Sequence, residues 1–118
     1  MQRRDFEQQV RANLPKVEAR PEFAGDRLWL TFYLCGLPKN LERVSDALAK
    51  SGWSNFSGGE GGFLYPKLQV EKDVSAIVEA AQRVQELCEQ QGAEIVGIDA
   101  DTSADMKSRC ESLYSKSA

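Results

Sequence analysis

The sequence predicts an α+β domain in which two strand–helix–strand units share one antiparallel sheet. Three observations predict this fold class. An apolar run at 28–35 is typical of a central strand, and apolar residues recur at helical spacing over 41–50 and 74–88. A length of 118 residues, with 42% hydrophobic and 28% charged side chains, suits one folded domain with a single core.

The N-terminal segment, residues 1–26, is expected to form a helix followed by a linker. The apolar positions of a helix over Asp5–Val17 share one face: Phe6, Val10, Leu14 and Val17. Pro15 removes a backbone donor from the last turn of this helix. Residues 20–26 are expected to be the linker, because Pro21 and Gly25 are typical of turns.

A central strand is expected over Leu28–Cys35, because both of its faces are largely apolar. Successive side chains alternate between the faces: Leu28, Leu30, Phe32 and Leu34 on one, and Trp29, Thr31, Tyr33 and Cys35 on the other. The turn that follows ends at Asn40, the expected N-cap of a helix over Leu41–Lys50. Gly52 is expected to end that helix.

Two further strands are expected at Trp53–Phe56 and Phe63–Val70, joined by the glycine-rich segment 57–62. Pro66 has no backbone donor, so the second of these strands should lie at an edge or be bulged there. The glycine-rich segment lacks the GxxxxGK[ST] pattern and precedes no helix. It is therefore interpreted as a hairpin connection and not as a phosphate site.

The second half begins at Asp73, the expected N-cap of another helix that Gly92 ends. The apolar stripe of this helix is Val74, Ile77, Val78, Ala81, Val84, Leu87 and Cys88. The last expected strand is Ala93–Ala100, with Val96, Ile98 and Ala100 on one face. A C-terminal helix is expected over Thr102–Leu113, since Met106, Cys110 and Leu113 recur at helical spacing.

Residues 27–101 therefore follow the order strand, helix, strand, strand, helix, strand, which is that of the ferredoxin-like fold. Right-handed crossovers place both helices on one face of a four-stranded antiparallel sheet. Terminal helices, within residues 1–26 and 102–118, are expected to cover the second face. That cover would explain why Trp29 and Tyr33 on the second face are apolar.

Composition and motifs argue against catalysis and against a bound cofactor or metal. The chain has no histidine, which removes the commonest general base and metal ligand. Its three cysteines form no CxxC pair and indicate neither a disulfide framework nor a zinc site. Asp99, Asp101 and Asp105 are carboxylates that a cation or an enzyme would use, but a solvated strand exit with helix-capping charge is the favoured interpretation.

The net charge of −3 and the isoelectric point near 5.0 argue against direct nucleic-acid binding, which needs a basic patch. No segment approaches the ~20 apolar residues that a membrane-spanning helix needs. The N-terminus also lacks the apolar core of a secretory signal. Together with the unpaired cysteines, these features predict a cytoplasmic protein.

Aromatic side chains are the main candidates for a contact surface. The favoured interpretation is that they pack in the core and across strands, and the alternative is an aromatic surface for a protein partner. The candidate partner-contact residues are Trp29, Tyr33, Trp53, Glu60, Phe63 and Tyr65.

Residues 28–100 resemble the ribonuclease E inhibitor B (RraB) family. The resemblance rests on the helix start Leu41-Glu42-Arg43-Val44, on the Gly52-Trp53 step and on Ala93-Glu94-Ile95-Val96-Gly97. It implies a ferredoxin-like, non-catalytic protein that binds an RNA-degrading enzyme and alters its action. The chain departs from the family at Ile98, where an aromatic residue is expected, and in its weaker acidity.

The sequence thus predicts a non-catalytic regulatory or adaptor domain that binds a protein partner, with no direct contact to nucleic acid or membrane. Two alternatives stay open: a small-molecule-binding sensor domain, and an immunity or antitoxin-like binding protein. A homodimer also stays open as the assembly, since domains of this fold often pair edge to edge and hold small-molecule ligands between subunits.

Overall fold

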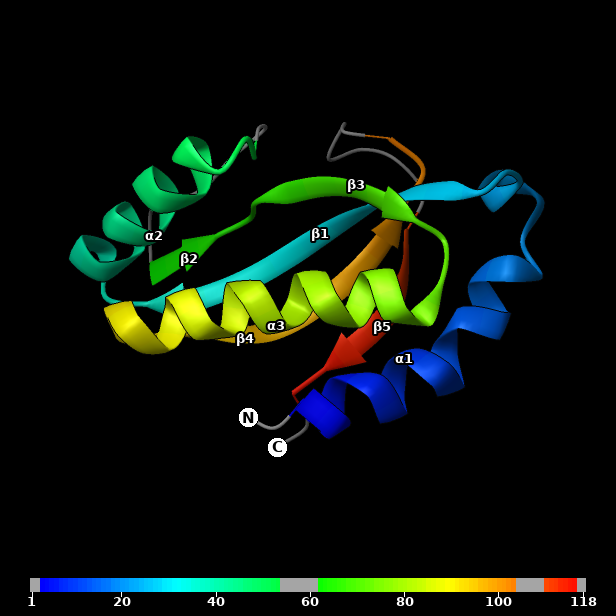
Figure 1. The fold of residues 1–118 in the computed structure, drawn as a ribbon, viewed down its shortest axis with the longest axis horizontal. Helices are drawn as coiled ribbons and strands as arrows, with labels where there is room; N and C mark the ends of the chain where they lie inside the picture. The colour runs from blue at the N-terminus through cyan, green and yellow to red at the C-terminus, as the bar shows by residue number, and fades with distance from the viewer. Residues whose placement is uncertain (1–2, 54–61, 104–109, 117–118) are drawn as a thin grey trace.

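The computed structural model describes residues 3–53, 62–103 and 110–116. Helices and strands alternate along most of the chain, in the order in which Figure 1 labels them. The elements are α1 (Arg3–Glu18), the short 3₁₀ helix η1 (Pro21–Phe23), β1 (Arg27–Gly36), α2 (Pro38–Lys50), β2 (Phe63–Leu64), β3 (Lys67–Glu71), α3 (Val74–Gln91), β4 (Ala93–Asp101) and β5 (Cys110–Ser115).

The described strands form one antiparallel sheet with β1 at its centre. On one side β1 pairs with β2 and β3, on the other side it pairs with β4, and β5 pairs with β4. The predicted α+β class and the predicted central position of the strand at 28–35 are confirmed. Five strands are described where four were expected, because one predicted strand is divided, β5 is added and the strand expected at Trp53–Phe56 is not among the described ones.

Pro66 divides the strand expected over Phe63–Val70 into β2 and β3 without changing its register. Leu34 pairs with Leu64 and Thr31 pairs with Lys67, so three residues separate the two pairs on both strands. Pro66 has no N–H to give to the ladder, but its carbonyl accepts a hydrogen bond of 2.9 Å from the Phe32 N–H. The strand expected at Trp53–Phe56 is not formed at Trp53, and residues 54–56 lie outside the described part.

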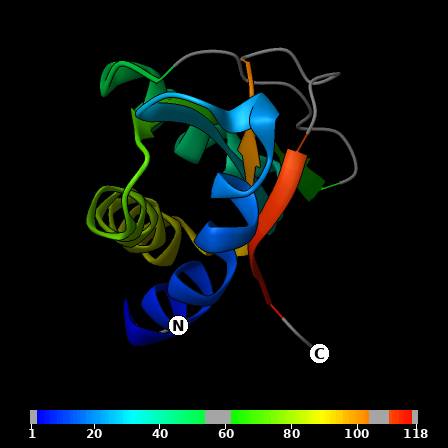
Figure 2. The ribbon, with the colours of Figure 1, turned by 90° about the vertical axis from the view of Figure 1, so that its right-hand side faces the viewer.

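The three helices lie on one face of the sheet (Figures 1 and 2). Their apolar sides and alternate residues of β1 form a single core cluster, in which Phe6, Leu30 and Phe32 are fully buried. The expectation that α1 covers the second face is wrong, because α1 packs against α3 and β5 on the face that the other helices share. Its predicted apolar stripe nevertheless points into the core, and the helix continues through Pro15 to Glu18.

Local chemistry explains where α2 and α3 begin and end. The prediction that Asn40 caps α2 is wrong: the helix starts at Pro38, whose fixed φ suits a first helical position. Asp73 caps α3 as predicted, with its Oδ1 accepting hydrogen bonds from the backbone of Ser75 and Ala76. Gly92 ends α3 at φ +74°, in the left-handed region that glycine adopts without strain.

The C-terminal helix expected over Thr102–Leu113 is wrong for residues 110–113, which belong to β5. Residues 104–109, which include Met106, lie outside the described part. A register shift in the β4–β5 pair lets two consecutive residues of β5, Leu113 and Tyr114, both be buried. A second shift, between β1 and β4, buries Ile95 in place of Val96, contrary to the predicted alternation.

Candidate functional site

The side of the sheet that faces away from the described helices is called the outer face here. Directly paired residues of an antiparallel sheet share a face, so the strand registers identify its members. They are Trp29, Thr31, Tyr33 and Cys35 of β1, Phe63 of β2, Lys67 and Gln69 of β3, and Asp99 and Asp101 of β4, with Tyr65 added by its ring contacts. This face carries most of the side chains that the sequence singles out.

A buried ion pair lies on the outer face between β3 and β4. The Lys67 Nζ donates hydrogen bonds to Asp101 Oδ2 at 3.0 Å and to the Ser103 carbonyl at 3.3 Å. The Thr31 hydroxyl donates a further hydrogen bond to the same carboxylate oxygen. Lys67 and Thr31 are fully buried and Asp101 is nearly so, and such charges are stable in a protein interior only when paired and hydrogen-bonded.

Tyr33 and Asp99 form a second polar contact beside this ion pair. The Tyr33 hydroxyl donates to Asp99 Oδ2 at 2.6 Å. Burial raises the pKa of the Asp99 carboxyl, the Tyr33 hydrogen bond opposes that shift, and the Asp101 charge adds to it. Burial and the Asp99 carboxylate both raise the pKa of the Tyr33 hydroxyl, which therefore stays a donor at neutral pH.

Cys88 and Cys110 do not have the properties of an activated nucleophile. Burial raises the pKa of the Cys88 thiol to about 12. Burial, followed by the Asp99 and Asp101 charges, also raises the pKa of Cys110, although this residue is exposed. Both thiols are thus protonated at neutral pH, whereas nucleophilic cysteines have a lowered pKa.

Asp99 and Asp101 share a face, as alternation along a strand predicts. The expected solvated strand exit is wrong for Asp101, which is buried and paired with Lys67. Asp99 is partly buried and accepts a hydrogen bond from Tyr33. Within the described residues no three His, Cys, Asp or Glu side chains are placed to hold a metal ion. The arrangement therefore links β1, β3 and β4 by charge-assisted hydrogen bonds, which hold these strands together.

The candidate partner-contact residues separate into three places. Tyr33, Phe63 and Tyr65 lie together, with ring centroids 5.5 Å apart for Tyr33–Tyr65 and 6.4 Å apart for Phe63–Tyr65. Trp29 lies on the same face, further along β1. Trp53 lies on the helix side, where its ring meets that of Phe32 at 5.4 Å, and Glu60 is outside the described residues.

Two large hydrophobic side chains of the described residues are exposed beside this aromatic group or at the same end of β1. Phe63 is 41% exposed and Leu37 is 68% exposed, and both lie at the end of β1 where Cys35 pairs with Phe63. We call Tyr33, Cys35, Leu37, Phe63 and Tyr65 the Phe63 patch. Sequence analysis missed Leu37, which lies between Gly36 and Pro38 in the predicted turn.

The helix side carries a separate cleft between α2 and α3, with a volume of about 290 Å³. It is lined by Ala47, Leu48, Ser51, Trp53, Arg83, Val84, Glu86, Leu87 and Gln90. Of the five candidate contact residues that the structure describes, only Trp53 lines this cleft.

No family model, no curated protein and no solved structure matches this chain. Within the described ranges, no helix is both long enough and apolar enough to span a membrane.

Proposed function

We propose that this chain is a non-catalytic regulatory or adaptor domain that binds a protein partner through the Phe63 patch. The observation that carries the proposal is the placement of Leu37 and Phe63. They are the two large hydrophobic side chains that the described residues leave exposed, and they lie at the same end of β1. A solvent-exposed apolar group of this kind is typical of a contact surface.

The patch has the composition and rigidity of a binding hot spot. Tyrosine and other aromatic residues dominate the energy of protein interfaces, because they bury a large area at small conformational cost. Here Tyr65 packs edge-on against Tyr33 and parallel to Phe63, so the three rings support one another. The Tyr33 ring is fixed further by its hydrogen bond to Asp99.

The resemblance to the ribonuclease E inhibitor B family suggests an RNA-degrading enzyme as the partner. Two features support the ferredoxin-like topology that this resemblance implies. The sheet order β3–β1–β4 is that of three neighbouring strands in a βαββαβ domain, and α2 and α3 lie on one face of the sheet. A regulatory role by contact also agrees with the absence of histidine and with two thiols of raised pKa.

The proposal is tested with purified ribonuclease E and a fluorescent RNA substrate. The chain should bind the enzyme and change its cleavage rate, and Phe63→Ser should weaken binding at least about tenfold, as expected for a central aromatic contact. Glu79→Gln is the matched control, because Glu79 is an exposed residue of α3, which lies on the face of the sheet opposite the Phe63 patch. This control variant should bind like the wild type.

A quantitative pull-down from lysate with the same three proteins extends the test to other partners. The proposal requires at least one protein that the wild type and Glu79→Gln retain and Phe63→Ser loses. Equal retention by all three proteins would contradict it. The partner can also be a second copy of this chain, and sedimentation of the purified protein tests this case. Self-association that Phe63→Ser abolishes would identify the second copy as the partner.

A further inference from the structure

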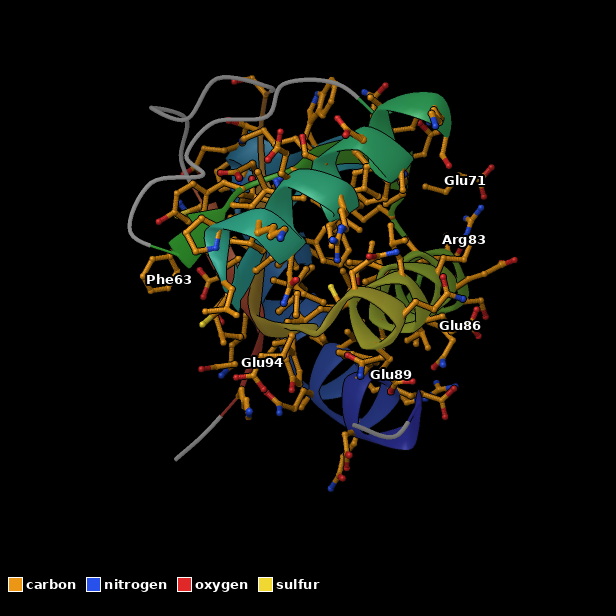
Figure 3. All side chains as sticks on the ribbon, turned by 90° about the vertical axis from the view of Figure 1, so that its left-hand side faces the viewer. Phe63, Glu71, Arg83, Glu86, Glu89 and Glu94 are labelled. Atoms are coloured by element: carbon orange, nitrogen blue, oxygen red, sulfur yellow. The ribbon has the colours of Figure 1, made fainter. Side chains whose placement is uncertain are left out.

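The cleft between α2 and α3 combines an apolar floor with a charged rim. Leu48 and Val84 are buried at its base, and Trp53 and Leu87 are partly buried beside them. Arg83 and Glu86 lie on its rim and are exposed. In Figure 3 both charged residues lie on the helix side of the molecule, away from Phe63.

The two rim charges are available to a ligand. Within the described residues, neither the Arg83 guanidinium nor the Glu86 carboxylate has a salt bridge or a side-chain hydrogen bond, to each other or to any neighbour. Positions three residues apart on a helix are neighbours, with roughly 5–6 Å between their Cβ atoms. The rim therefore offers one positive and one negative group side by side above an apolar surface.

We propose that this cleft binds a free α-amino acid with an apolar side chain. The Arg83 guanidinium takes the carboxylate of the ligand, since guanidinium and carboxylate form paired hydrogen bonds, and the Glu86 carboxylate takes its ammonium group. The ligand side chain enters between Leu48, Trp53 and Leu87. The cleft volume of about 290 Å³ lies at the lower end of the range for drug-sized ligands, which favours a smaller molecule such as an amino acid.

Charge complementarity distinguishes this ligand from a peptide segment or a simple hydrocarbon. A residue inside a peptide has neither the free ammonium nor the free carboxylate that the two rim charges would pair with. A hydrocarbon would leave both charges partnered by water alone. For a ligand of about ten heavy atoms in an open cleft, a Kd of about 1 mM is expected.

The chain has its own fluorescent reporter for this site. It contains two tryptophans: Trp53 lines the cleft, whereas Trp29 lies on the outer face, across the sheet. The variant Trp29→Phe therefore leaves Trp53 as the single reporter. L-leucine, L-isoleucine, L-valine, L-methionine and L-phenylalanine are each titrated to about 20 mM, well above the expected Kd. At least one of them should change the Trp53 emission in a saturable way.

Ligand analogues then test each rim charge separately. L-leucinamide lacks the carboxylate and 4-methylpentanoate lacks the ammonium, so each should bind at least about threefold more weakly than L-leucine. Arg83→Ala should abolish the difference between leucine and leucinamide, and Glu86→Gln should abolish the difference between leucine and 4-methylpentanoate. Arg43→Ala, which removes an exposed arginine of α2 outside the cleft, is the control and should leave all three affinities unchanged.

Two results would overturn the proposal. One is the absence of any saturable change with all five amino acids. The other is equal affinity for leucine and for N-acetyl-leucinamide, which would show that the cleft takes a side chain of a peptide. The cleft and the Phe63 patch are tested by different reporters and different variants. A negative result for amino-acid binding in the cleft would therefore not count against partner binding at the Phe63 patch, and the reverse also holds.

Discussion

At the scale of single residues, Lys67 and Asp101 place opposite charges in the interior of a small protein. Removing an ion from water is costly, and the attraction between the ions offsets that cost only when the geometry is good and the remaining hydrogen bonds are made. Both conditions are met: the Lys67 Nζ has two acceptors, and Asp101 Oδ2 has two donors. The loss of one partner should therefore cost far more than the pair itself contributes.

Lys67→Met is expected to lower the free energy of unfolding by about 3–5 kcal/mol, because it leaves the Asp101 carboxylate buried without its counter-ion. The double variant Lys67→Met/Asp101→Asn removes that charge and should be at least about 1 kcal/mol more stable than Lys67→Met. Urea denaturation at neutral pH measures the wild type, Lys67→Met, Asp101→Asn and the double variant.

Lys50→Met provides the control for this prediction, since Lys50 is an exposed lysine in the last turn of α2. Its effect should stay within about 0.5 kcal/mol. A double variant in which the two single losses simply add would contradict the interpretation of Lys67 and Asp101 as a coupled pair.

The sequence predicted part of this arrangement. Alternation along a strand placed Asp99 and Asp101 on one face, and the structure confirms it. Lys67 was missed, because a lysine in a strand beside Pro66 is ordinarily solvent-exposed and nothing local points to a carboxylate 34 residues away. Contacts of this range depend on the sheet register, which the local pattern does not determine.

At the scale of elements, side chains of α1 hydrogen-bond to the backbone of β5 along the edge that pairs with no other described strand. The Gln9 amide donates to the Ser115 carbonyl at 3.1 Å and accepts from the Ser115 N–H at 3.0 Å. Asn13 donates to the Leu113 carbonyl at 3.0 Å. Four residues of a helix rise about 6 Å and two residues of a strand about 6.8 Å, so successive turns of α1 meet alternate residues of β5.

Gln9→Ala and Asn13→Ala are each expected to lower the free energy of unfolding by about 0.5–1.5 kcal/mol, the net value of a typical hydrogen bond. The Ser115 amide should also exchange its hydrogen faster in Gln9→Ala, because its acceptor is gone. Gln8→Ala is the matched control, as Gln8 is the exposed neighbour on the same helix. If Gln8→Ala and Gln9→Ala are equally stable and exchange alike, α1 does not protect this edge.

The contact between α1 and β5 also shows why some elements could be predicted from the sequence and β5 could not. Local chemistry is sufficient for α3, where Asp73 and Gly92 mark both ends, and for β1, whose faces are both apolar. It fails for β5, because the spacing of Cys110 and Leu113 is also compatible with a helix. What favours the strand is β4 on one side and α1 on the other, and the hydrogen-bonding residue of α1 lies 106 positions away.

At the scale of the whole molecule, the sheet separates two kinds of surface. The helix side holds the core and the cleft at Trp53, and the outer face holds the buried ion pair and the Phe63 patch. Two phenylalanines on paired strands illustrate the division. Phe32 of β1 points into the core and is fully buried, whereas Phe63 of β2 points outward and is 41% exposed.

The two phenylalanines should therefore differ sharply when each is replaced by alanine. Phe32→Ala is expected to lower the free energy of unfolding by about 3–5 kcal/mol, because it removes buried area and leaves a cavity. Phe63→Ala loses mainly its stacking on Tyr65, so its cost should stay below about 1.5 kcal/mol. Urea denaturation of both variants against the wild type makes the comparison.

The difference between these two costs decides how a loss of partner binding is interpreted. If Phe63→Ala is nearly as stable as the wild type, weaker binding by a Phe63 variant reports a lost contact, because the fold that presents the patch is intact. A cost as large as that of Phe32→Ala would instead show that Phe63 is part of the core. The Phe63 patch would then lose the exposed aromatic residue on which the proposed partner contact depends.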